Sequence, residues 1–321
     1  MARSAQGPRR FLIVRRDNIG DLVCTTPLFD ALRAAFPEAR IAALVNTYNA
    51  AVLSGNPAVD EVFAYEKLKH RTRSLPGHLL ATARLYARLR GERFDRVLVP
   101  VDSSQSRAMA SRVRAGEVLV APKEVPPGVH EVERTFALAR RLGIAGDPGA
   151  VRVFADETLA ATIREKYLLR SPIAVHISAR RPAQQWPAER YLELVRALGR
   201  DGEVMLLWAP GARSDPRHPG DDETARLIAE RVACTPVETR TLPALIAALS
   251  LARKVVCPDG GAMHLAAGLG KPIVALFGDS PVERWHPWGV PHRVVRPESR
   301  DLKDLPLGPV LEAFAALPDV R

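Results

Sequence analysis

The first strand-to-helix turn of the chain has one carboxylate where many such turns have a phosphate-binding loop. Residues 17–27 read DNIGDLVCTTP, after the apolar run 11–14 and before an amphipathic segment. The turn lacks the pattern G-x-G-x-x-G, and we expect Gly20 to set its bend. At the carboxyl end of a buried strand, Asp21 can act as a base toward a substrate hydroxyl, or it can cap the helix that follows.

A second segment, CPDGGAMH, suits the binding of a phosphate. We expect a strand to end here and a helix to begin, so that Gly260 and Gly261 let a ligand approach the free N–H groups of the helix start. His264 in the first turn adds a donor. The structural alternative is a helix cap by Asp259 and a packed histidine. A neighbouring glycine turn, FGDSP, favours the phosphate-bearing ligand.

Two further segments of the second half contain polar side chains next to expected helix starts. In HISARRPAQQWPAERY, Ser178 can donate to a phosphate, and Arg180 and Arg181 can neutralise it. The alternative is an exposed basic loop. In DDETARLIAE, Glu223 can accept a hydrogen bond from a sugar hydroxyl, although acidic residues in a first helical turn are also good caps.

Alternating strand-like and helix-like segments must position these residues. Helical periodicity occurs in DLVCTTPLFDALRAAF, LPGHLLATARLYARLRG, WPAERYLELVRALG, DDETARLIAERV and TLPALIAALSLA. The strand-like runs are FLIVRR, ARIAALV, EVFAY, RVLVPVD and EVLVAP in the first half, and PIAVHIS, EVMLLWAP, KVVCPDG and PIVALFG in the second. This alternation predicts an α/β protein of two tandem Rossmann-like, doubly wound domains. Ligands are expected at the carboxyl ends of the strands, facing an interdomain cleft.

The length of 321 residues also fits two domains. A polar, proline-containing junction near residue 168 suggests a first domain over 1–168 and a second over 169–300. The remaining residues, 301–321, include PLGPVLEAFAALPDVR, which predicts a terminal helix that can pack back on the first domain.

The charge of the chain is concentrated in its first half. The net charge is +10, and residues 1–150 have 23 Lys and Arg against 15 Asp and Glu, whereas residues 151–321 have 23 against 21. A cationic half suits an anionic partner such as nucleic acid, a phospholipid surface or a phosphorylated substrate, unless the arginines reflect composition alone. Aromatic residues make up only 6% of the chain, which disfavours binding by base stacking.

The cysteine and hydropathy patterns indicate the cellular compartment of the protein. Cys24, Cys234 and Cys257 lie far apart with no metal-ligand spacing, so we expect buried thiols and no metal site. No apolar run approaches the length of a membrane span. We therefore expect a soluble cytoplasmic protein that can touch the inner face of the membrane.

The ordered set of motifs resembles the family-nine glycosyltransferases, the heptosyltransferases that build the inner core of bacterial lipopolysaccharide. FLIVRRDNIGDLVCTTPLFDAL is similar to the family's opening motif, with its strand, GD and TTP. QQWPAERY corresponds to K-x-W-P-x-E-x-[FY], DGGAMHLAA to D-[TS]-G-x-x-H-x-A, and FGDSP to FG-x-T-x-P. The resemblance covers most of the chain.

The resemblance implies a B-type glycosyltransferase fold. The second domain would bind ADP-L-glycero-β-D-manno-heptose and the first an anionic sugar-lipid acceptor with carboxylates and phosphates. The reaction would invert the anomeric centre without a metal or cofactor. The family's catalytic aspartate falls on Asp21, and the basic residue that ends the first strand, Arg15, is expected to hold that carboxylate or the acceptor. The donor-binding positions fall on Ser178, Glu223, Asp259, Gly261 and His264.

The sequence departs from the family pattern at two donor-binding positions. Gln184 and Gln185 stand where many members have a lysine, and we expect Arg180 or Arg181 to replace that cation. Gly260 stands where Thr or Ser is usual. These departures leave open another hexose-like donor sugar or another acceptor. A nucleotide-binding regulatory protein, a nucleic-acid-associated protein and a sugar-nucleotide epimerase remain as readings from other classes.

Overall fold

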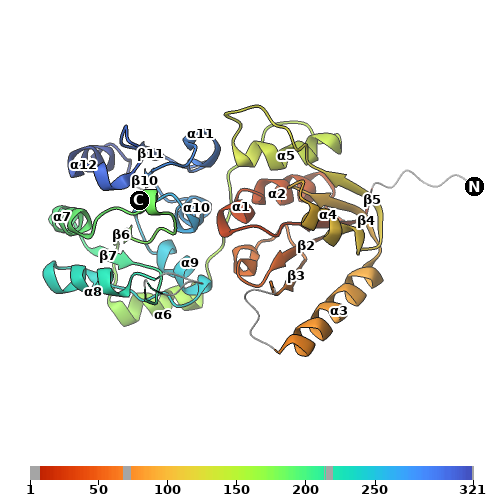
Figure 1. Ribbon diagram of the computed structural model, residues 1–321, viewed down its shortest axis with the longest axis horizontal. Helices are drawn as coiled ribbons and strands as arrows, with labels where there is room; N and C mark the ends of the chain where they lie inside the picture. Colours follow the sequence, from red (N-terminus) through yellow and green to blue (C-terminus); the bar gives the residue numbers. More distant parts are fainter. Residues whose placement is uncertain (1–7, 68–73, 213, 215–219, 320–321) are drawn as a thin grey trace, which may run out of the picture. The chain divides into compact units, whose positions relative to one another are not determined.

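The computed structural model describes residues 8–67, 74–212, 214 and 220–319. The chain divides into two compact units, Met1–Val151 and Arg152–Arg321. Each unit is a parallel sheet with helices on both faces, which confirms the predicted α/β class (Figure 1).

The first unit is built on five parallel strands in the order β3-β2-β1-β4-β5. Its strands are β1 (Arg10–Val14), β2 (Arg40–Asn46), β3 (Glu61–Tyr65), β4 (Phe94–Val99) and β5 (Ala115–Val120). Its helices are α1 (Ile19–Val23), α2 (Thr26–Ala35), the 3-10 turn η1 (Ala50–Leu53), α3 (Leu75–Glu92), α4 (Ser104–Ser111) and α5 (Glu131–Arg141). Helices α3 and α4 pack on one face of the sheet through Tyr86, Leu89 and Met109, and α2 packs against α5.

The second unit is built on six parallel strands in the order β11-β10-β9-β6-β7-β8. Its strands are β6 (Ile173–His176), β7 (Val204–Leu207), β8 (Thr235–Pro236), β9 (Lys254–Pro258), β10 (Ile273–Leu276) and β11 (His292–Val295). Its α-helices are α6 (Glu157–Tyr167), α7 (Ala188–Leu198), α8 (Asp222–Arg231), α9 (Leu242–Ser250), α10 (Gly261–Gly268), α11 (Val282–Trp285) and α12 (Leu307–Ala315). Two 3-10 turns, η3 (Pro182–Gln184) and η4 (Leu302–Asp304), complete it.

The strand orders place a topological switch point in each sheet. Chain connections leave in opposite directions from β1 and β4 in the first unit, and from β6 and β9 in the second. Such a point opens a crevice beyond the carboxyl ends of the two strands, where doubly wound proteins bind ligands. Asp21 follows β1, whereas Ser178 follows β6 and Asp259 follows β9. The residues singled out from the sequence therefore lie at the two switch points.

The division between the units comes earlier than the boundary expected at residue 168. Helix α6 packs against α9 of the second unit, and the backbone N–H of Val153 donates to the carbonyl of Gly268 at 2.8 Å. Residue 168 only ends α6, in a left-handed conformation with a φ of 56°.

The terminal helix α12 packs on the second sheet, and its packing on the first domain stays a prediction. It contacts β10, β11 and α7. Its buried side chains Val310 and Phe314 join the core cluster that contains Tyr191 and Leu194 of α7. An apolar helix face of this kind takes the nearest unfilled core, which here belongs to the second sheet.

Candidate functional site

Asp21 lies in the third position of the short helix α1, directly beyond β1. The backbone N–H of Asn18, the N-cap residue, donates to its Oδ2 at 3.0 Å. This bond is one of the two that form a capping box between Asn18 and Asp21, so the capping alternative is correct in outline, with Asn18 rather than Asp21 at the N-cap. Gly20, expected to set a turn, lies within the helix instead. The Asp21 side chain is 14% exposed, which leaves part of the carboxylate open to a ligand.

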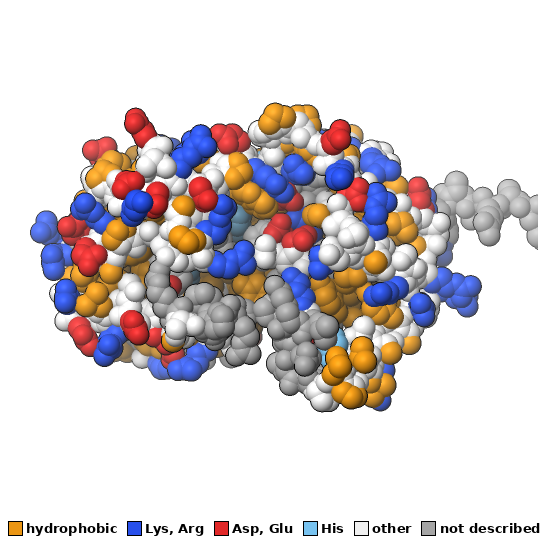
Figure 2. Space-filling view, viewed as in Figure 1, with side chains coloured by type: hydrophobic (Ala, Val, Ile, Leu, Met, Phe, Trp, Pro, Cys, Tyr) orange, Lys and Arg blue, Asp and Glu red, His pale blue; other side chains and the backbone are white. Residues whose placement is uncertain are grey.

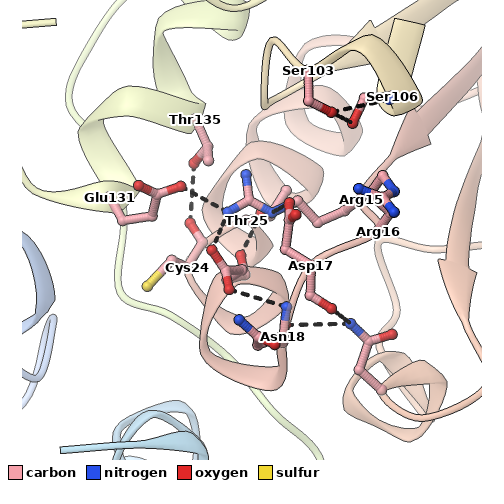
Figure 3. Close-up of polar contacts among 12 residues, drawn as sticks. Arg15, Arg16, Asp17, Asn18, Cys24, Thr25, Ser103, Ser106, Glu131 and Thr135 are labelled. Atoms are coloured by element: carbon pink, nitrogen blue, oxygen red, sulfur yellow. Dashed lines mark hydrogen bonds and ion pairs between the residues drawn. The ribbon is translucent and has the colours of Figure 1, made fainter. Parts of the chain in front are cut away.

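Arg15 holds the other oxygen of this carboxylate. Its Nη2 donates to Asp21 Oδ1 at 2.9 Å and to Glu131 Oε1 at 2.7 Å, and its Nε lies 3.4 Å from Asp17 Oδ2 (Figure 3). The Arg15 side chain is 0% exposed. Burial alone would lower the pKa of Arg15, but the three carboxylates outweigh it and raise that pKa above its usual value. Arg15 is therefore placed to hold Asp21, and its burial does not suit the acceptor contact considered from the sequence.

Glu131, the buried partner of Arg15, was not found from the sequence. It is the first residue of α5, behind the N-cap His130, whose Nδ1 accepts from the backbone N–H of Val132 at 3.1 Å. A second bond fixes α5 to the turn after α1, since Thr135 Oγ1 donates to the carbonyl of Cys24 at 3.1 Å. An acidic residue at a helix start is ordinary capping chemistry, so only its buried contact with Arg15 distinguishes it.

Two buried asparagines fix the loop between β1 and α1. The side-chain amide of Asn46 donates to the carbonyls of Arg16 and Asp17 at 3.2 and 3.0 Å. The amide of Asn49 donates to the carbonyls of Asp17 and Asn18, both at 3.3 Å. Because these bonds satisfy backbone groups that the turn leaves unpaired, the loop is held in one conformation and Asp21 with it.

Asp17 adds a third carboxylate to this site. Burial is the largest cause of the raised pKa of Asp17, which the charge of Asp21 raises further while Arg15 and Arg16 oppose both. The three carboxylates thus outnumber the one fully buried arginine. Such a group of coupled acids with a partly open member is a suitable place for proton transfer.

In the second unit, Asp259 is linked to the glycine turn after β10. The amide of Gln184 donates to Asp259 Oδ2 at 2.7 Å and also contacts Ser280 Oγ. Gly278 makes this possible, because a Cβ there would lie 2.0 Å from the carbonyl oxygen of Ala183. The backbone of η3 therefore rests directly on the turn, and the two glycine-rich turns predicted from the sequence are neighbours.

Arg181 joins the same group, and both Arg181 and Arg180 are exposed. Arg181 Nη2 donates to Asp279 Oδ2 at 2.5 Å, and its Nη1 donates to Ser280 Oγ at 3.2 Å. Its side chain is still 50% exposed, so the guanidinium can meet a ligand at the edge of this turn. Of the two candidate replacements for the missing lysine, Arg181 is the one that this network orders.

The other expected donor-binding residues lie at the carboxyl ends of neighbouring strands. Ser178 Oγ accepts from the backbone N–H of Ala209 at 2.8 Å, which joins the loops after β6 and β7. Glu223 lies exposed in the first turn of α8, and the preceding Asp222 accepts from Trp208 Nε1 at 2.7 Å. The structure thus keeps both the capping and the ligand-binding interpretation of Glu223 open.

The start of α10 presents backbone donors next to a buried histidine. Gly260 is the N-cap, and nothing lies within 4 Å of the Cβ that a larger residue would have there. Gly261 is the first helical residue. His264 is 4% exposed, and its ring packs edge-on against Trp285 with the centroids 5.9 Å apart. His264 is therefore a packed side chain, in the first turn of a helix whose N-terminal N–H groups suit a phosphate.

The described residues lack two other kinds of feature, a metal-binding cluster and a membrane-spanning helix. They contain no group of three or more His, Cys, Asp or Glu arranged to hold a metal ion. None of their helices combines the length and the apolar character that crossing a membrane requires.

Comparisons with known proteins agree on one family. The family model described as glycosyltransferase family 9 (heptosyltransferase) matches residues 82–307. Lipopolysaccharide heptosyltransferase 2 of Salmonella typhimurium is 27% identical over 89% of this chain and 88% of its own length.

Solved structures show a similar fold. The E. coli heptosyltransferase WaaC, solved with ADP, has a TM-score of 0.79 and 21% identity over 95% of this chain and 99% of its own. The E. coli ADP-heptose lipopolysaccharide heptosyltransferase II has a TM-score of 0.74 and 24% identity over 96% and 98%. Both likenesses confirm the two-domain fold of B-type glycosyltransferases.

Proposed function

The chain belongs to glycosyltransferase family 9, and from this we propose that it transfers a heptose from ADP-heptose to the inner core of lipopolysaccharide, with Asp21 as the base. The family makes it a glycosyltransferase. The observation that carries the proposal is the Asp21 carboxylate beyond β1, held by Arg15 and by the backbone of Asn18 with one edge exposed. The names of the relatives support the donor and the acceptor.

The proposed reaction is a displacement at the anomeric carbon. Asp21 takes the proton of an acceptor hydroxyl as its oxygen forms the new bond to that carbon. The bond between the carbon and the diphosphate oxygen breaks, and its electron pair leaves with ADP. Attack from the side opposite the leaving group inverts the anomeric centre. Arg15 donates to one Asp21 oxygen and the Asn18 N–H to the other, and a carboxylate oxygen that accepts such a bond still has a lone pair for the incoming proton.

Groups of the second unit would stabilise the leaving diphosphate. The N–H groups at the start of α10 and the guanidinium of Arg181 are the positive groups available around Asp259 and Ser280. A helix start and a fixed cation can stabilise developing negative charge without a metal or a cofactor. Ser178, Arg180, Glu223 and His264 are proposed to complete the donor site from the neighbouring strand ends.

The acceptor is proposed to be anionic. Residues 1–150 have 23 basic against 15 acidic side chains, so the unit that contains Asp21 attracts carboxylates and phosphates. A lipid-linked acceptor would also bring the protein to the inner face of the membrane. Gly260 and Gln184 distinguish this chain from the usual family pattern and favour a test of donors beyond ADP-heptose.

The direct test offers the purified protein a panel of sugar nucleotides and truncated lipopolysaccharide cores, and follows ADP release and product mass. ADP release that requires both ADP-heptose and a core acceptor is the expected result. Product formed without acceptor would indicate an epimerase. Release with a different sugar nucleotide would keep the class and correct the donor. Salt-sensitive DNA binding with no affinity for ADP would support a nucleic-acid-associated protein.

A further inference from the structure

The outward face of α3 is apolar. Six large hydrophobic residues are exposed in the described part of the chain: Tyr48, Leu75, Leu79, Leu80, Val118 and Leu168. Three of these lie in the first two turns of α3, where Leu75, Leu79 and Leu80 are 48%, 58% and 52% exposed. Figure 2 shows hydrophobic side chains gathered over this helix. Isolated exposed leucines are common, but three together on one helix need an explanation.

The exposed fractions show that these residues do not belong to the core. His78, Tyr86 and Leu89 face the sheet and are buried. Pro76, Leu79, Leu80, Ala83 and Ala87 are exposed and form, beside this buried face, an apolar stripe that ends at the exposed Arg84. A helix on a soluble protein's surface normally has polar residues at such exposed positions. We name the residues Leu75, Pro76, Leu79, Leu80, Ala83 and Ala87 the α3 surface.

The α3 surface adjoins the edge of the sheet that carries Asp21. Helix α3 follows β3, and β3, β2 and β1 are neighbours in a parallel sheet, so their carboxyl ends share one edge. A pocket between β3 and α3 is lined by Thr47, Tyr65 and His78. The next residue after Thr47 is Tyr48, which is 52% exposed. Neighbouring strands are about 4.8 Å apart, so β3, which lines this pocket, lies about 10 Å from β1.

Cations lie beside the α3 surface. Arg84 and Arg88 are exposed on α3 itself, although Arg88 also pairs with Glu61 and stacks on Phe63. The unit as a whole has the basic surplus described above. An apolar helix face with arginines at its side binds at the boundary between lipid headgroups and acyl chains, and anionic lipids strengthen that binding.

We propose that the α3 surface docks on an anionic phospholipid membrane and so presents Asp21 to an acceptor held in that membrane. The membrane contact stands on the exposed residues alone, whereas its link to an acceptor rests on the proposed function. A second copy of this chain is the competing occupant, and its oligomeric state distinguishes the two.

The test compares two double variants. Leu79→Ser with Leu80→Ser removes half-exposed apolar side chains from the α3 surface, and Val118→Ser with Leu168→Ser removes the same number elsewhere. Both are mixed with vesicles of phosphatidylglycerol and phosphatidylethanolamine, or of phosphatidylcholine alone, and sedimented. We expect the wild-type chain and the control to bind the anionic vesicles, with affinity that falls as salt rises, and the α3 variant to bind at least about tenfold more weakly.

Four results would overturn the proposal. The first is that the wild-type chain does not bind anionic vesicles, and the second is that it binds phosphatidylcholine vesicles equally well. The third is that both double variants lose the same amount of vesicle affinity. The fourth is that sedimentation velocity shows a wild-type dimer and a monomeric α3 variant. Turnover of a lipid-free core acceptor by the α3 variant should equal that of wild type, and a loss there would also count against a purely membrane role. Vesicle binding by a wild-type chain that turns over no acceptor would instead refute the proposed function and leave the membrane surface intact.

Discussion

Replacing Glu131 by Gln should weaken catalysis although Glu131 touches no substrate. The exchange keeps the shape of the side chain and an oxygen that can accept from Arg15, but it removes the charge of the carboxylate that is buried with Arg15. A hydrogen bond to a charged partner contributes about 1–2 kcal/mol more than one to a neutral partner, so we expect a loss of that size in the stability of the first unit.

The same exchange alters Asp21 through Arg15. Arg15 Nη2 is shared between Glu131 Oε1 at 2.7 Å and Asp21 Oδ1 at 2.9 Å. Without the negative charge of Glu131, Arg15 interacts more strongly with the Asp21 carboxylate. Asp21 then becomes a weaker proton acceptor. The weaker hydrogen bond from Arg15 to a neutral amide oxygen also loosens the orientation of Arg15. Both effects lower kcat, by about tenfold for each 1.4 kcal/mol transferred to the barrier.

The assay is steady-state ADP release with chemical unfolding as the companion measurement. We expect kcat to fall about three- to tenfold while the KM for ADP-heptose stays within about twofold, because the proposed donor site lies in the second unit. Glu133→Gln is the matched control, since Glu133 lies in the same first turn of α5 but pairs with the exposed Arg140 at 2.9 Å. Equal effects of the two variants, or a loss of stability with unchanged kcat, would refute the positioning role of Glu131.

Two further predictions concern the second unit. Arg181→Ala should raise the KM for the sugar nucleotide about three- to tenfold with little change in kcat, whereas Arg190→Ala, which removes another half-exposed arginine paired with Glu193, should not; unchanged kinetics would exclude Arg181 as the replacement cation. Burial lowers the pKa of His176 to about 4. Between pH 6.5 and about 4, His176 is therefore protonated in the unfolded chain but neutral in the folded chain. The stability of this unit should therefore fall by up to about 3 kcal/mol as the pH drops from 6.5 to about 4. His176→Leu should abolish that part of the acid sensitivity in urea unfolding, and an unchanged slope would contradict the assignment.

The layout of the fold could be predicted because hydrophobic periodicity is local. Segments such as FLIVRR and LPGHLLATARLYARLRG became β1 and α3. The boundary between the two units could not be predicted in this way. The polar junction near residue 168 led us to place residues 152–167 in the first domain. What places α6 in the second unit is its packing on α9, more than 70 residues later in the chain.

The candidate site was predictable where its residues lie next to strand ends. Ser178 and Asp259 lie within two residues of a strand end, Asp21 lies in the first turn of the helix after β1, and the family motifs mark the same positions. Glu131 was missed because it is 116 residues from Arg15 in sequence, and an acidic helix start carries no sign of its distant partner. Likewise, the contact of Gln184 with Asp259 spans 75 residues. The sequence showed Gln184 only as a missing lysine.

The central claim is that Asp21 removes the proton of the acceptor hydroxyl. The measurement that tests it most directly is kcat for heptose transfer by Asp21→Asn, with ADP affinity measured by calorimetry and folding checked by circular dichroism. General base catalysis contributes about 100- to 10,000-fold, so kcat should fall by that factor while ADP binds as it does to the wild-type chain. A correctly folded Asp21→Asn protein that turns over within about tenfold of the wild-type rate would contradict the claim.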